Sequence, residues 1–276
     1  MTSLAHAKEL ASGFDAELIM VHVLSDVPFF YVPFLGESSA YLSTIDSVKN
    51  ESSSRLEQLA DRARKQGVSA RTMLLEGSAY IEIVKFAESE GADLIVMSTT
   101  GKKGVEKLLI GSTAQKVVRK APCPVLTVPT PGRESVSFKN LLVLTDLSGL
   151  SALALPYVKD ISQEFDSRIT ALHIMEAEFE LDPDEQGLLI SAIQSAMEDI
   201  IIKDMGKVFD DEVEKVVVKA EDPLSGLQKF ASENPVDLVI MTTHGRTGLS
   251  RVLMGSVAEK ILGSVKLPIL TVRARK

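Results

Sequence analysis

The sequence predicts an α/β protein built from two tandem domains, each with a doubly wound parallel sheet. Residues 93–128 align without a gap on residues 237–272 at an offset of 144, and 15 of these 36 positions are identical. Residues 14–24 align on residues 165–175 at an offset of 151. A period of this length is typical of a duplicated domain rather than of a short solenoid repeat. Apolar runs alternate with amphipathic stretches in each half, which favours parallel strands covered by helices on both faces.

The second half shows this alternation element by element. Its expected strands are short runs rich in Val, Ile and Leu, over residues 140–146, 169–175, 213–220, 237–243 and 268–274. Its expected helices have apolar residues at helical spacing, over residues 151–165, 187–209, 224–233 and 250–264. A segment with the Pro, Gly and Ser of a linker separates the halves at residues 130–137. We therefore expect domains over residues 1–130 and 138–276.

The first half lacks one strand of the second. At the offset of 151, Met1 lies opposite Ala152, so the first half has no counterpart of residues 139–151. The first strand of a doubly wound sheet is normally central, and its loss leaves backbone groups unpaired. The first domain is thus expected to be incomplete at its N-terminus, through either a truncated sequence or a degenerate domain.

Composition and charge narrow the classes of function. The chain has 30 Lys and Arg against 38 Asp and Glu, for a net charge of −8, which argues against nucleic acid as a partner. Cys123 is the single cysteine, and no Cys or His spacing resembles a metal site. No run approaches the about 18 apolar residues of a membrane span. We therefore expect a cytoplasmic protein without a membrane partner, with Cys123, His22 and His173 as core residues.

The passage from residue 241 to residue 260 is the clearest candidate binding site. It follows a predicted strand, contains Gly245 and Gly248, and continues through Gly255 and Ser256 into a predicted helix. Glycine lets the main chain approach a ligand closely, and the N–H groups of a helix N-terminus suit an anionic phosphate. Open α/β sheets bind ligands at the carboxyl ends of their strands. The passage therefore predicts a phosphate-binding loop.

This pattern resembles the universal stress protein family, over both halves and nearly the whole chain. Nucleotide-binding members of that family carry G-x-x-G, nine further residues, and then G-S or G-T, directly after a strand. Gly245, Gly255 and Ser256 match this pattern, whereas Thr242 stands in place of the leading glycine.

The resemblance implies a role for each matched residue of the second half. Asp146 is implied to meet the adenine edge, Ile174 to pack on the base, and Met241 to lie beside the ribose. The expected nucleotide-binding residues are Thr145, Asp146, Ile174, Met241, Thr242, Gly245, Gly255, Ser256 and Val257.

The first half carries only part of this set. Its matching residues are Val23, Met97, Gly101, Gly111, Ser112 and Thr113. Ser98 stands in place of the leading glycine, and the counterpart of Asp146 is absent. The second domain is therefore the expected principal site.

The resemblance further implies a Rossmann-like, adenine-nucleotide alpha hydrolase-like fold in a stress-response protein that ATP or AMP regulates. An accompanying Mg²⁺, slow ATP hydrolysis and a homodimer stay open, and no dedicated catalytic residue is expected because no nucleophile and base recur in both halves. The last strands, at residues 125–128 and 269–272, are implied to pair within the chain. Two alternatives remain: an interaction module without nucleotide, and the soluble regulatory tail of a transporter.

Overall fold

The computed structural model describes residues 2–25, 39–99, 110–130, 135–176, 182–206, 212–243 and 254–273. The chain forms two compact units, one of Leu4–Ala92 and the other of Met1–Ser3 with Asp93–Lys276. Each unit has its own sheet. Within the described ranges, no helix is long and apolar enough to cross a membrane.

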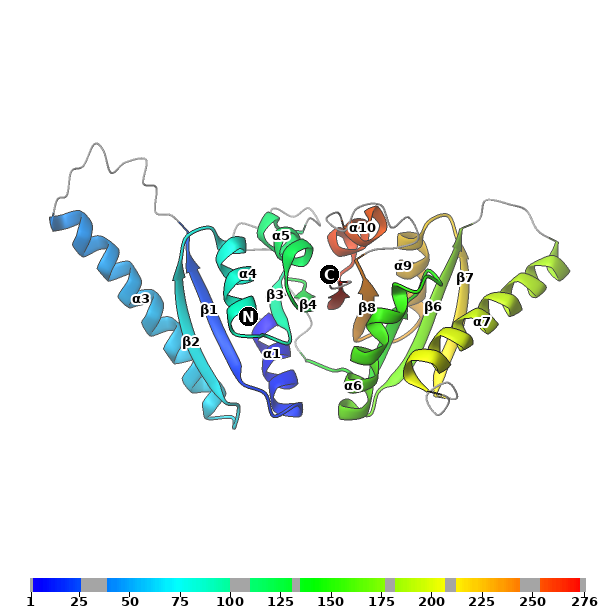
Figure 1. Cartoon of the computed structure of the whole chain (residues 1–276), viewed down its shortest axis with the longest axis horizontal. Helices are drawn as coiled ribbons and strands as arrows, with labels where there is room; N and C mark the ends of the chain where they lie inside the picture. Colours follow the sequence, from blue (N-terminus) through cyan, green and yellow to red (C-terminus); the bar gives the residue numbers. More distant parts are fainter. Residues whose placement is uncertain are drawn as a thin grey trace. The chain divides into compact units, whose positions relative to one another are not determined.

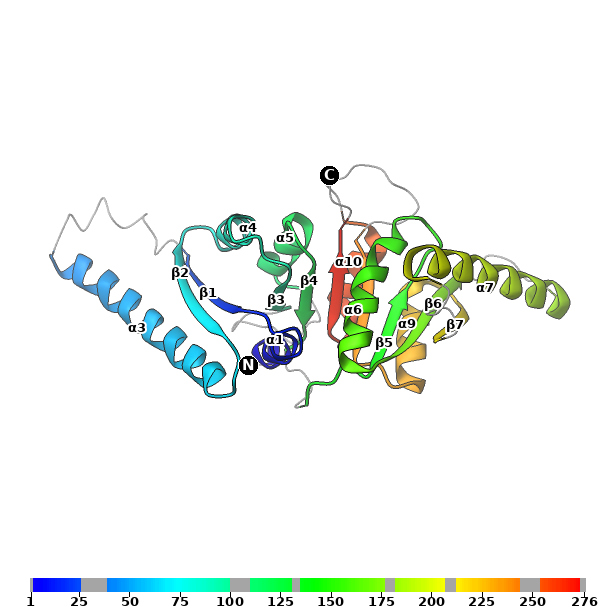
Figure 2. The same ribbon diagram turned by 60° about the horizontal axis from the view of Figure 1, so that its bottom comes forward.

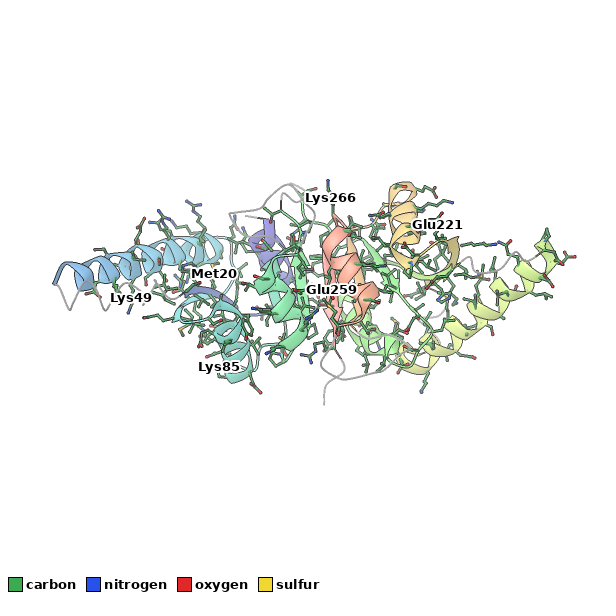
Figure 3. The ribbon with its side chains drawn as sticks, turned by 90° about the horizontal axis from the view of Figure 1, so that it is seen from above. Met20, Lys49, Lys85, Glu221, Glu259 and Lys266 are labelled. Carbon is green, nitrogen blue, oxygen red and sulfur yellow. The ribbon has the colours of Figure 1, made fainter. Side chains whose placement is uncertain are left out.

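The smaller unit is built on two parallel strands. β1 (Leu18–Leu24) pairs with β2 (Ala70–Glu76) along their whole length. α3 (Ser39–Arg64) and α4 (Ala79–Ser89) lie on opposite faces of this pair (Figure 2). A buried apolar cluster joins β1 to α3 and to α1 (Thr2–Gly13), and Figure 3 labels its β1 member, Met20. The cluster consists of Ala11, Met20, Ala60, Ala63 and Val68.

The larger unit contains a sheet of seven strands in the order β3-β4-β9-β8-β5-β6-β7. All neighbouring strands are parallel except β4 and β9, which are antiparallel. The strands are β3 (Ile95–Ser98), β4 (Val125–Val128), β5 (Asn140–Leu144), β6 (Arg168–Glu176), β7 (Val213–Ala220), β8 (Leu238–Thr242) and β9 (Ile269–Val272).

Helices cover both faces of the second-half strands, as the continuous apolar runs require. α6 (Leu155–Phe165) and α7 (Pro183–Met205) lie on one face, whereas α9 (Pro223–Glu233) and α10 (Ser256–Ser264) lie on the other (Figures 1 and 2). A short 3-10 helix, Ser151–Ala154, precedes α6. α5 (Ser112–Lys120) is the first-half counterpart of α10.

The boundaries of two helices, α7 and α10, differ from the sequence expectation. α7 begins at Pro183 rather than at residue 187, because Asp182 and Glu185 form a reciprocal capping box around its first turn. The same helix ends at Met205 rather than at residue 209, where Gly206 adopts a φ of 90°. α10 begins at Ser256 rather than at residue 250, because Gly255 is an extended N-cap residue; residues 250–253 lie outside the described ranges.

β5 is the strand that the first half lacks. It pairs with β6 on one side and with β8 on the other. The first-half counterparts of β6 and β8 are β1 and β3, and these two strands belong to different sheets. In the part of the chain that the structure describes, β3 pairs with β4 alone. The predicted fold class is therefore confirmed: two tandem Rossmann-like repeats, of which the first lacks its first strand.

The missing strand changes the burial of matched residues. Val239 and Ile240 of β8 are 0% exposed, whereas their counterparts Ile95 and Val96 are only half-buried. His173 is buried as expected, but the same expectation is wrong for His22, which is exposed on β1. In the described residues β1 pairs only with β2 and β3 only with β4, so each has one neighbouring strand where β8 has two. Cys123 is buried, which confirms its assignment to the core.

Candidate functional site

The topology brings the predicted second-half residues to one edge of the large sheet. From β5 the chain proceeds outward through β6 to β7, and then crosses to the opposite side of β5 to form β8 and β9. The strand order therefore reverses between β5 and β8, and open α/β sheets bind ligands at such a switch point. Thr145 and Asp146 directly follow β5, and Met241 and Thr242 end β8. Met241 is buried and Thr242 is half-buried.

Asp146 lies in a tight turn that its own side chain organises. Its Oδ1 accepts hydrogen bonds from the backbone N–H of Ser148 at 3.0 Å and from the Ser148 hydroxyl at 2.6 Å. Leu147, between them, has a φ of 63°, in the left-handed region that few side chains adopt. The Thr145 hydroxyl accepts from the Leu147 N–H at 3.0 Å. These bonds hold the turn after β5 in a defined conformation at the sheet edge.

β6 contributes one residue to each face of the sheet at this edge. His173 Nδ1 lies 2.9 Å from the carbonyl oxygen of Thr145, which ties β6 to the turn after β5. Ile174 points toward α9, because a Cβ added at Gly226 would lie 2.8 Å from Ile174 Cγ2. The absence of a side chain at Gly226 thus provides the space that Ile174 fills. Sequence reasoning missed Gly226, whose only signal was a glycine inside a predicted helix.

The N-terminus of α10 is the candidate phosphate site. The N–H of Gly255 donates to the carbonyl of Thr243 at 2.8 Å, which anchors the start of α10 to the end of β8. Gly255 is the N-cap residue and makes no side-chain capping bond. Ser256 and Val257 follow in the first turn, and both are exposed. Gly245 lies outside the described residues.

α9 and α10 differ in whether the N-cap side chain accepts hydrogen bonds from the first backbone N–H groups of the helix. Asp222 caps α9 by accepting from the N–H groups of Ser225 and Leu224, at 2.9 and 2.7 Å. The bond from Ser225 is the main cause of the lowered pKa of Asp222. α10 has a glycine in the equivalent position and therefore no carboxylate of its own on its first turn's N–H groups. The N-terminus of α10 can therefore bind an external anion, because the positive end of the helix dipole lies there.

The first half reproduces the loop anchor but not the complete site. The N–H of Gly111 donates to the carbonyl of Thr99 at 2.6 Å, and Gly111 has φ and ψ of −61° and 145°, against −59° and 146° at Gly255. Ser112 and Thr113 follow in α5, and Met97 is half-buried on β3.

Val23 belongs to the smaller unit, whereas the other described residues of the set, Met97, Gly111, Ser112 and Thr113, belong to the larger unit. Gly101 lies outside the described ranges. A contact that sequence reasoning missed joins the Ser98 hydroxyl to that of Ser3 at 3.0 Å. No group of three or more His, Cys, Asp or Glu side chains that could hold a metal occurs among the residues described.

These features define a tandem α/β protein with a glycine-anchored helix N-terminus at its sheet switch point. The universal stress protein family matches residues 2–129 and 137–273 of the chain. The chain therefore belongs to the universal stress protein family, which confirms the resemblance seen in its sequence.

Individual relatives agree with this assignment. A universal stress protein of Methanocaldococcus jannaschii is 43% identical over 129 residues, which cover 47% of this chain and 74% of the relative. One of Mycobacterium tuberculosis is 27% identical over 191 residues, or 67% of this chain and 63% of the relative. The crystal structure of a universal stress protein from Archaeoglobus fulgidus has a TM-score of 0.70 at 20% identity, covering 98% of this chain and 92% of that one. This last likeness shows that the tandem fold extends over nearly the whole chain.

Proposed function

We propose that this chain binds an adenine nucleotide, ATP or AMP, at the carboxyl edge of its second half. The observation that carries the proposal is the N-terminus of α10, where the N-cap residue Gly255 makes no side-chain capping bond and is anchored to the end of β8 at the switch point of the sheet. Family membership supports it, because the motif of the family's nucleotide-binding members includes Gly245, Gly255 and Ser256.

Each part of the nucleotide has a proposed partner. The N–H groups at Ser256 and Val257, with the Ser256 hydroxyl, bind phosphate oxygens, and Gly245 and Thr242 border the same loop. Asp146 and Thr145 meet the adenine or ribose from the turn after β5. Ile174 packs on the base, and Met241 lies beside the ribose. Mg²⁺, where present, arrives with the phosphates of ATP.

The first half is proposed as the weaker site or as no site. Gly101, Gly111, Ser112 and Thr113 supply the phosphate loop, but the strand that would carry the adenine-facing carboxylate is lacking. Val23 and Met97 complete the proposed first-half set, and they belong to different compact units.

The biological role proposed is that of a cytoplasmic stress-response protein, in which nucleotide occupancy biases conformation or assembly. We assign no dedicated catalytic residue. The domain limits proposed are residues 1–130 and 138–276, and pairing of β4 with β9 is proposed to join these domains within one chain. Formation of a homodimer by two chains requires a separate measurement.

Thermal unfolding with ATP and AMP, each with and without Mg²⁺, tests the proposal. A ligand that binds only the folded state stabilises it by about 2.7 kcal/mol at one hundred times Kd. The informative variant is Gly255→Val, whose side chain would crowd the α10 N-terminus while its Cβ, 3.4 Å from the Thr243 carbonyl, still fits. Its matched control is Gly111→Val, at the same position of the first half.

We expect the wild type and Gly111→Val to gain stability with nucleotide, and Gly255→Val to gain none. Ser256→Ala, which keeps the backbone intact, should show a reduced gain. The reverse pattern, with binding lost only in Gly111→Val, would place the site in the first half. A wild type that responds to no nucleotide would contradict the proposal and favour an interaction module. Ser98 and Thr242, which stand in place of the motif's leading glycine, already favour that alternative.

A further inference from the structure

β4 and β9 form an antiparallel seam whose two sides are copies of each other. Leu126 faces Leu270, and these residues are repeat counterparts at the offset of 144. Thr127 and Thr271 are also counterparts, and each donates its hydroxyl to a carbonyl of the opposite strand, at 3.2 and 3.1 Å. All four side chains are buried. The seam strands therefore differ only by the one methylene between Val125 and Ile269, which distinguishes β4 weakly from a second copy of β9.

The helices beside the seam are not copies in their charges. Glu259 of α10 accepts hydrogen bonds from the Gln115 side-chain amide and from Arg119 Nη2, the latter at 3.1 Å. Figure 3 labels Glu259 on α10, beside α5. Gln115 is the repeat counterpart of Glu259 itself, and the counterpart of Arg119 is Gly263. One helix thus supplies an amide and a cation, and the other supplies the carboxylate.

This asymmetry matters for any pairing between like halves. If the β9 strands of two chains paired in the same register, Glu259 would face Glu259, and Gly263 would offer no cation to either. If two β4 strands paired, Gln115 would face Gln115, and each Arg119 would find Gln115 of the other chain in place of a carboxylate. Like charges brought together at a partly buried surface repel each other. Glu259 and Arg119 are 41% and 32% exposed, so solvent screens this repulsion only in part.

We propose that Gln115, Arg119 and Glu259 select the partner of the seam. The surface of β9 and α10 accepts a strand and helix that carry an amide and a cation, as the first half of this chain does, and it rejects a second copy of itself. The inference extends the proposed pairing of the last strands and is independent of nucleotide binding.

A disulfide reporter in the full chain measures the mixed pairing. With Cys123→Ser, Leu126→Cys and Leu270→Cys, the two new cysteines are register partners. Facing residues of antiparallel strands have Cα atoms about 4.5 to 5.5 Å apart, within the range that a disulfide spans. The fraction of intrachain disulfide in a glutathione redox buffer then gives the effective concentration of the two strands.

Reversing one charge of the Arg119–Glu259 pair should change this effective concentration, and reversing both charges should not. Arg119→Glu should lower it about threefold to fivefold, as expected when a half-exposed ion pair becomes a repulsion. Adding Glu259→Arg to Arg119→Glu should restore it. The control Arg55→Glu, which reverses an exposed pair with Glu51 on α3, should leave it unchanged.

A second reporter measures like-with-like pairing. The full chain with Cys123→Ser and Leu270→Cys forms a covalent dimer only through contact between chains, and we expect little of it. The proposal is overturned if Arg119→Glu leaves the intrachain disulfide unchanged, if the double reversal fails to restore it, or if this dimer forms as readily as the intrachain bond. Should the cysteine variants fail to fold, urea unfolding of the same charge variants in the natural chain measures the coupling, and an absent coupling contradicts the proposal.

Discussion

Replacing Gly226 by alanine tests how tightly α9 packs on the candidate site. The added Cβ would lie 2.8 Å from Ile174 Cγ2, closer than Cβ atoms approach in real proteins, and 3.1 Å from Ala220 Cβ, which is already a tight contact. Ile174 is β-branched and stiff at χ1, so its methyl group cannot move away cheaply. Overpacking of this kind costs about 1 to 3 kcal/mol, whereas alanine gains about 1 kcal/mol of helix propensity over glycine. We therefore expect a net destabilisation of up to about 2 kcal/mol.

Gly187→Ala is the matched control. Gly187 also lies inside a helix, α7, but an added Cβ would meet no atom within 4 Å. This variant should be stabilised by about 0.5 to 1 kcal/mol. Urea unfolding followed by circular dichroism compares the two variants with the wild type. If Gly226→Ala proved as stable as Gly187→Ala, the close approach of α9 to Ile174 would be refuted. An unchanged nucleotide affinity in Gly226→Ala would instead argue against contact between Ile174 and the base.

Two further predictions concern strand burial and pH. Backbone amides of β1 and β3 should exchange with deuterium faster than those of β6 and β8, because the first half lacks the strand that separates the latter pair; equal protection would contradict this. Asp222 has a lowered pKa, mainly through the N–H of Ser225, so its stabilising effect is present above its unfolded pKa of about 3.9 and is lost as pH falls through the folded value. Asp222→Ala should therefore lower the urea midpoint at pH 7 and lower it less at pH 3; an equal loss at both values would exclude the carboxylate charge as the cause.

Much of the second half follows from local pattern. The expected strands and helices recur in the structure because a short apolar run and a helical stripe of apolar residues are properties of neighbouring residues. The expected helix at 224–233 is α9, and the expected strand at 213–220 is β7. The boundaries of α7 differ because the capping box of Asp182 and Glu185 outweighs the apolar pattern that begins later.

The candidate site also contains residues that the local sequence identifies and contacts that it does not. Gly255 and Ser256 could be identified from the spacing of a loop motif, which is local in the chain. The contact of Ile174 with α9, the bond from His173 to the Thr145 carbonyl and the asymmetric contacts of Glu259 join residues far apart in sequence. No spacing rule could have found them.

The sequence alone determined that the chain is a duplication, that its second half holds the complete set of strands, and that the first half is one strand short. These conclusions need only an alignment of the chain with itself. Only the tertiary structure showed the consequences of lacking that strand. β1 and β3 belong to separate sheets, and His22 is exposed whereas His173 is buried. The first-half site residues are divided between two units. Strand order and burial depend on hydrogen bonds between distant segments, and the lack of a counterpart of β5 removes such bonds from the first half without changing any local pattern.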